Sequence, residues 1–208
     1  MTERKLSRRE KEQLRHRDLI YRAAMDLFAE KGYFNVTMSE IAERAEFSIG
    51  TLYKFFESKD SIYDCIILDN ANMIIGKLIG TIDGIDDPRS AIKAYIRGSA
   101  EGFSEAVTVM RLFLSQYEGL AGPRRKVVQE KIGSKVLELE SGLQEVIRRG
   151  IREGVFREMD PVFLATGLMG LIKGYFTRTM GEREEAVTEA DVENLYDLFM
   201  NGASLASH

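Results

Sequence analysis

The chain has 208 residues, 44% of them hydrophobic and 30% charged, with a formal net charge of −4. This length and composition fit a soluble globular protein with its own hydrophobic core, and no run of about 18 apolar residues predicts a membrane span. The polar N-terminus lacks the apolar segment of a signal peptide, and the single cysteine, Cys65, excludes an internal disulfide, so a cytoplasmic protein is expected.

Helical periodicity runs through almost every segment, and no convincing alternation of period two indicates a strand. The first helix is predicted from about Arg9 to Lys31, with Gly32 as its C-terminal cap. A capping box at Thr37-Met38-Ser39-Glu40 opens the second helix. A third short helix is predicted over 49–55, with Ser48 as its N-cap.

Longer helices follow in the rest of the chain. A fourth helix is predicted from residues 58–60 to about Gly80, followed by a loop over 81–87. Asp87-Pro88 and Asp160-Pro161 both combine an N-cap residue with proline at the first helical position. Pro123 opens another helix, and the last is predicted from Thr188 to about Ala206. The fold class is therefore all-α, with about nine helices.

The sequence contains no recognisable set of residues that would form the catalytic site of an enzyme. The two histidines, His16 and His208, form no metal-binding pair or catalytic triad with any neighbour. Neither a Gly-x-x-x-x-Gly-Lys-Ser/Thr loop nor a Gly-x-Gly-x-x-Gly loop is present. We therefore expect no catalytic residue, no metal and no cofactor.

Nucleic-acid binding is the remaining chemistry, and its signal is concentrated near the N-terminus. Residues 1–17 hold seven basic and three acidic side chains, a net charge of 7 − 3 = +4. Such a basic arm often touches nucleic acid, although a solvated tail is the plainer alternative.

Two short helices joined by a tight turn over 45–48 have the layout of a helix-turn-helix, whose second helix enters the DNA major groove. Glycine inside a helix costs about 1 kcal/mol relative to alanine, so Gly50 suggests that something approaches the backbone closely. Ile49 and Thr51 suit base edges, Lys54 can reach a base or phosphate, and the Tyr53 hydroxyl can donate to a phosphate. Caps and a small core in an ordinary helical bundle would explain each of these residues singly.

The order of these features resembles the DNA-binding domain of the tetracycline-repressor (TetR) family. The resemblance covers the run "IYRAAMDLFAEKGYFNVTMSEIAERAEFSIGTLYKFFESKDSIYDCI", from Ile20 to Ile66. It implies phosphate contacts and base-region contacts by two sets of residues. The phosphate set is Thr37, Ser48, Tyr53 and Lys59, and the base-region set is Ile49, Gly50, Thr51 and Lys54. The chain departs from the family at Glu46, where glycine is common; a left-handed backbone there would store about 1 kcal/mol of strain.

The resemblance also implies a two-domain organisation, with a DNA-binding domain and basic arm at 1–58 and a ligand-binding and dimerisation domain at 59–208. Aromatic residues and methionines predict the effector pocket: Phe103, Met110, Phe113, Tyr117, Met169 and Tyr175. One stripe of the helix after Pro161 and two residues of the last helix predict the dimer interface: Val162, Ala165, Met169, Ile172, Phe176, Leu195 and Phe199.

The expected function is a ligand-responsive transcriptional regulator, acting as a repressor that a small, largely apolar effector releases from a palindromic operator. Its partners would be double-stranded DNA, the effector and a second copy of the chain, with no membrane. The alternative is a helical enzyme or sensor that reuses the fold without binding DNA.

Overall fold

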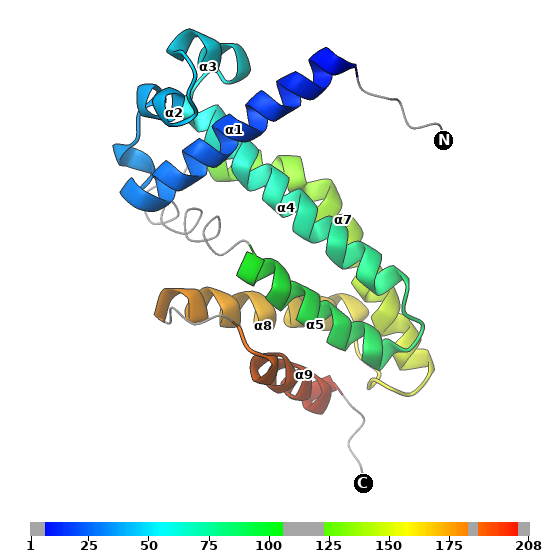
Figure 1. Cartoon of the computed structure of the whole chain (residues 1–208). Helices are drawn as coiled ribbons and strands as arrows, with labels where there is room; N and C mark the ends of the chain where they lie inside the picture. Colours follow the sequence, from blue (N-terminus) through cyan, green and yellow to red (C-terminus); the bar gives the residue numbers. More distant parts are fainter. Residues whose placement is uncertain (1–6, 106–122, 183–186, 204–208) are drawn as a thin grey trace. The chain divides into compact units, whose positions relative to one another are not determined.

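The computed structural model describes residues 7–105, 123–182 and 187–203, which form eight α-helices, one short 3-10 helix and no strand (Figure 1). This confirms the predicted all-α class. The chain divides into two compact units, and the boundary between them falls inside helix α4, between Asp69 and Asn70. Each unit is described separately below.

The first unit contains the helix-turn-helix that the sequence predicted. Its elements are α1 (Arg8–Lys31), η1 (Tyr33–Asn35), α2 (Met38–Arg44), α3 (Ile49–Phe55) and the first turns of α4 (Lys59–Asp83). Gly32 ends α1 at φ 75°, a backbone angle that glycine adopts without strain. Thr37 and Ser48 cap α2 and α3 as predicted.

Packing, rather than intrinsic propensity, holds the short helices of this unit, because a helix of seven residues is not stable alone in water. The core face of α1 is buried through Ile20, Ala23, Ala24, Leu27 and Phe28. Leu52 of α3 is 0% exposed and Phe56 is buried just behind it. Burial of one such side chain contributes about 1.5–3 kcal/mol, so these two residues anchor α3.

The turn between α2 and α3 places Glu46 in the left-handed region, at φ 59°. The Phe47 N–H donates to the carbonyl of Ala42 at 2.8 Å, and the Glu46 N–H donates to that of Glu43 at 3.0 Å. These two bonds form a Schellman motif, whose left-handed position is most often glycine. The left-handed backbone considered for Glu46 is therefore confirmed, and this conformation crowds its Cβ.

Replacing Glu46 should separate the cost of backbone conformation from that of charge. We expect Glu46→Gly to raise the free energy of unfolding by up to about 1 kcal/mol. Glu46→Gln is the matched control, because it removes the charge but keeps the crowded Cβ, and its stability should stay near that of the wild type. Urea denaturation of both variants measures the difference. Equal stabilisation by both would assign the effect to charge instead.

The second unit contains the remainder of α4 with α5 (Pro88–Glu105), α7 (Pro123–Arg152), α8 (Pro161–Glu182) and α9 (Glu189–Ala203). Both predicted proline starts are confirmed: the Asp87 carboxylate accepts from the Ser90 N–H, and that of Asp160 accepts from the Val162 N–H, each at 2.9 Å. Because α4 continues to Asp83, the loop before α5 is shorter than predicted.

Five of the seven predicted interface residues lie in the core of this unit, which corrects that prediction. They are Ala165, Ile172, Phe176, Leu195 and Phe199, each at most 8% exposed within a single chain. Side chains covered by their own subunit cannot meet a second one directly. Met169 is half-buried against the same core, and Val162 is exposed. A helix apolar on two faces does not reveal from its sequence which face packs inward.

Helix α4 is long and apolar enough, by length and composition, to cross a membrane. It is the one such helix among the described residues, and 28% of its most apolar window is buried. Its apolar side chains serve the two cores: Ile62 and Ile66 are fully buried in the first unit, and Leu78 and Ile82 are buried in the second. Core packing therefore accounts for part of the apolar character of α4.

Candidate nucleic-acid interface

The exposed face of α3 carries the residues predicted to read DNA. With Leu52 turned inward, Ile49, Gly50, Tyr53 and Lys54 are exposed, and Thr51 is half-buried. Among the described residues, no hydrogen bond or ion pair engages the Tyr53 hydroxyl or the Lys54 ammonium. Both polar groups are therefore free to bind a ligand from solvent.

Gly50 lies in the first turn of α3 with open space around it. A Cβ built on this residue would meet no atom of the chain within 4 Å. The fold therefore gives no packing reason for glycine at this position.

The two helix-capping hydroxyls differ in how much bonding capacity they retain. The Ser48 Oγ accepts from the Thr51 N–H at 3.2 Å and lies 2.9 Å from the Thr51 hydroxyl. The Thr37 hydroxyl instead donates to the Glu40 carboxylate at 2.8 Å, as does the Thr37 N–H. Lys31 and then Thr37 donate to that carboxylate and lower the pKa of Glu40 to about 2, so it stays ionised. The Thr37 hydroxyl proton is thus already in use.

Lys59 is not a free cation at the surface. Its Nζ donates to the backbone carbonyls of Tyr33 at 2.6 Å, Val36 at 2.7 Å and Phe34 at 3.4 Å. It also lies 4.3 Å from the centroid of the Tyr33 ring, where the cation is attracted by the aromatic face. An ammonium has three donors, and all three are occupied within the chain. Burial lowers the pKa of Lys59.

Tyr33 connects the start of α4 to the segment that leads into α2. Its hydroxyl donates to Asp60, and its ring lies 5.0 Å from that of Tyr63 and 5.3 Å from that of Phe28. We call Tyr33, Lys59, Asp60 and Tyr63 the α4 clamp. Sequence reasoning missed Asp60 and Tyr63, although their helical spacing after Lys59 places them in the same first turns.

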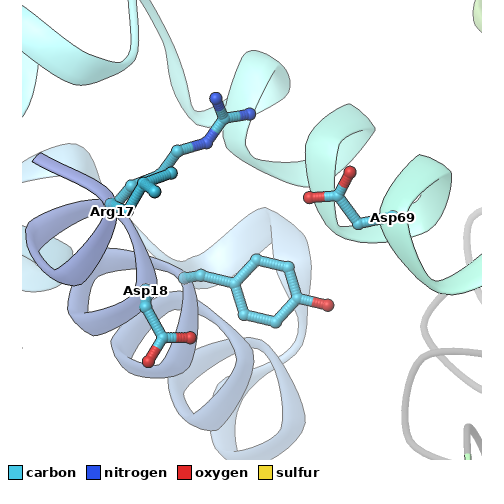
Figure 2. Close-up of a pocket in the computed structure, with 5 residues that line it drawn as sticks. Arg17, Asp18 and Asp69 are labelled. Carbon is cyan, nitrogen blue, oxygen red and sulfur yellow. The ribbon is translucent and has the colours of Figure 1, made fainter. Parts of the chain in front are cut away.

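A hollow of about 440 Å³ lies in the first unit, between α1 and α4. Leu14, Arg17, Asp18, Tyr21 and Asp69 line it, and Figure 2 shows Arg17 and Asp18 projecting from α1 opposite Asp69 of α4. One guanidinium and two carboxylates make it unlike the apolar pocket that the sequence predicted. Beside it, the Arg17 guanidinium donates to the Cys65 sulfur at 2.8 Å, and burial raises the pKa of that thiol.

The predicted effector pocket can be followed only in part. Met110, Phe113 and Tyr117 lie outside the described residues. Phe103 and Tyr175 both contact Phe176, with ring centroids 4.8 and 5.8 Å apart, and the Tyr175 hydroxyl donates to Asp191. Met169 packs on the same core. The structure therefore brings Phe103 and Tyr175 to one ring in the core of the second unit.

Comparison with known proteins agrees with this geometry. Residues 20–65 match the family model of bacterial regulatory proteins of the tetR family. Residues 20–65 are therefore a DNA-binding domain of the tetR type. Together with the relatives described next, this match confirms the prediction of a DNA-binding transcriptional regulator rather than an enzyme.

Relatives of this regulator are similar to it over part of their length. It is 28% identical over 142 residues to the transcriptional repressor KstR2 of Rhodococcus jostii, covering 68% of each chain. It is 27% identical over 108 residues to the transcriptional regulator UidR of Escherichia coli, covering 52% of this chain and 54% of UidR. The chain thus spans about half the length of UidR in that alignment.

Solved structures share the fold over nearly the whole chain. The fatty acid degradation regulator FadR of Bacillus halodurans superposes with a TM-score of 0.71 at 19% identity, covering 95% of this chain and 97% of FadR. The ketosteroid transcriptional regulator KstR2 of Mycobacterium tuberculosis gives 0.65 at 18% identity, covering 91% and 95%. At these identities the likeness establishes the shared fold.

Proposed function

We propose that this regulator is a cytoplasmic repressor whose α3 reads an operator through the DNA major groove. The observation that supports this most directly is the exposed face of α3, where bare Gly50 lies beside the uncommitted Tyr53 hydroxyl and Lys54 ammonium. Ile49, Gly50, Thr51 and Lys54 lie over base edges in this proposal, and Ser48 and Tyr53 bond phosphates.

The proposal gives Thr37 and Lys59 different roles from those that the resemblance implied. In this proposal, a phosphate of the DNA backbone is bound at the start of α2 by free backbone N–H groups of the first turn. The Thr37 hydroxyl stays in its capping box. Lys59 positions the helix-turn-helix by holding the carbonyls before α2. It contributes to binding through geometry rather than through a phosphate contact.

The direct test is a mobility-shift assay with DNA from upstream of the protein's own gene. We expect a discrete complex that an unlabelled upstream fragment displaces and a random fragment does not, because base contacts distinguish the two. Equal displacement by both fragments would show that the chain does not read sequence at this site.

Binding to an inverted repeat requires a two-fold dimer, and we propose that α8 and α9 form it. Phe163 of α8 is 65% exposed and Leu198 of α9 is 60% exposed. Gly167, Gly170 and Gly174 follow Phe163 along one face of α8, and a Cβ on any of the three would meet nothing within 4 Å. Glycines inside a helix lower its stability, and close packing of another backbone against this stripe would offset that cost.

A large side chain in this stripe should separate the subunits without unfolding them. We expect Gly170→Leu to fold normally, because its Cβ has open space, but to sediment as a monomer and to lose the upstream complex. Gly80→Leu is the matched control, since Gly80 is also exposed and open in a helix. A dimeric Gly170→Leu variant in analytical ultracentrifugation would exclude this face as the interface.

The effector is proposed to be small and largely apolar. The aromatic grouping of Phe103, Phe176 and Tyr175 supports this, and two proteins that share the fold are named for fatty acid degradation and for ketosteroids. Helix α4 contributes residues to both units, and its first turns carry three members of the α4 clamp. It is therefore the proposed route by which effector binding is coupled to DNA binding. Coupling is reciprocal, so operator DNA should weaken effector binding by the same factor as effector weakens DNA binding.

A further inference from the structure

A row of cations lies on the first turns of α1, outside the helix-turn-helix. Arg8, Lys11 and Arg15 are three and four residues apart, which places them on one face of the helix. We call these three residues the basic stripe. All three are exposed, and no carboxylate in the described part of the chain forms an ion pair with them. By contrast, Arg22 further along α1 is paired with Asp18 at 3.0 Å.

Contacts just after the stripe fix α1 against the helix-turn-helix. The His16 ring packs on Phe47 of the turn, with centroids 4.9 Å apart, and on Phe55 at the end of α3, at 6.0 Å. The Arg17 guanidinium lies 5.5 Å from the centroid of the Phe56 ring. The eight residues before His16 therefore extend α1 by about 12 Å beyond the part of the helix that is packed on the helix-turn-helix. Figure 1 shows these turns projecting past α2 and α3.

Helix stability does not account for cations at this place. The N-terminus of a helix carries a partial positive charge, so Arg8 and Lys11 are repelled there, and acidic residues would be favoured. Glu10 is the acidic residue of the first turn, and it bonds Ser7 in the capping box. The unfavourable charges lie on the turns of α1 that project past α2 and α3, where an external polyanion could offset them.

We infer that the basic stripe binds the phosphate backbone of the DNA that flanks the bases read by α3. The inference rests on the proposed DNA-binding function, because α3 and the stripe belong to one compact unit and a duplex on α3 continues beyond it. Guanidinium and ammonium groups bind phosphate oxygens strongly and without regard to sequence. The stripe therefore adds affinity and salt dependence but no base preference.

The test compares the full-length wild type with the variant Arg8→Gln/Lys11→Gln/Arg15→Gln. A matched control neutralises three exposed cations of the second unit, as Lys131→Gln/Lys135→Gln/Arg157→Gln. Fluorescence anisotropy with a random-sequence duplex of about 30 base pairs, between about 50 and 200 mM salt, gives the slope of log affinity against log salt. We expect the stripe variant to lose about 2 to 3 units of slope per bound subunit, and the control to match the wild type.

Two further measurements exclude simpler explanations. The melting temperature of the stripe variant should equal or exceed that of the wild type, because the removed cations oppose the helix dipole. Upstream duplexes with longer flanks should bind the wild type more tightly than short ones, and this gain should vanish in the stripe variant.

A stripe variant with the salt slope and flank dependence of the wild type would overturn the inference and leave the proposed function standing. A wild type that binds no duplex at low salt would overturn both. A slope lost equally by the stripe variant and the control would also overturn the inference, since the effect would then come from net charge alone.

Discussion

Gly50→Ala should stabilise the protein and weaken its binding to DNA. Alanine favours the helix, so the free energy of unfolding should rise by up to about 1 kcal/mol, and the open space around Gly50 leaves the methyl group unhindered in the free protein. On DNA, the same methyl group would occupy the space between the α3 backbone and the groove. We expect affinity for the upstream fragment to fall at least about tenfold, or about 1.4 kcal/mol.

Urea denaturation and anisotropy titration of the same samples measure the two opposite effects. Gly80→Ala is the control, because it removes an equally open glycine from α4 at a distance from the helix-turn-helix in sequence. It should raise stability without changing DNA affinity. Wild-type DNA affinity in Gly50→Ala would show that the backbone of α3 does not approach the duplex closely.

Lys59→Met should destabilise the first unit and weaken binding to every DNA sequence alike. Methionine keeps the apolar stem but cannot donate to the carbonyls of Tyr33, Phe34 and Val36. Loss of these charge-assisted bonds should lower the free energy of unfolding by about 1–3 kcal/mol. Because no phosphate contact is lost, the slope of log affinity against log salt should not change.

Lys54→Met supplies the contrast, since its ammonium has no partner among the described residues. Its free energy of unfolding should stay within about 0.5 kcal/mol of the wild type. Its DNA binding should fall by about 1–3 kcal/mol at the base pair that it reads, with altered base preference there. Should Lys59→Met keep full stability and show a shallower salt slope, Lys59 would be a phosphate ligand and the α4 clamp would have no positioning role.

Local signals in the sequence determined the elements of the first unit. The capping residues Thr37 and Ser48, the glycine after Lys31 and the apolar spacing of α1 each act over one or two helical turns, so they could be recognised without the fold. The family resemblance also drew attention to Glu46, because glycine is common at that position, and the structure places Glu46 in the left-handed region there.

The groups that remain available to a partner depend on contacts between segments that are distant in sequence. In the sequence, Lys54 and Lys59 are both lysines of predicted helical segments. In the structure, three carbonyls that lie 23 to 26 residues before Lys59 accept from its ammonium, whereas the Lys54 ammonium has no partner among the described residues. In the same way, α8 is apolar on two faces, and packing against its neighbours selects the face with Ala165 and Phe176 for the core. Such choices depend on contacts between distant segments, and the spacing of residues along one helix carries no information about them.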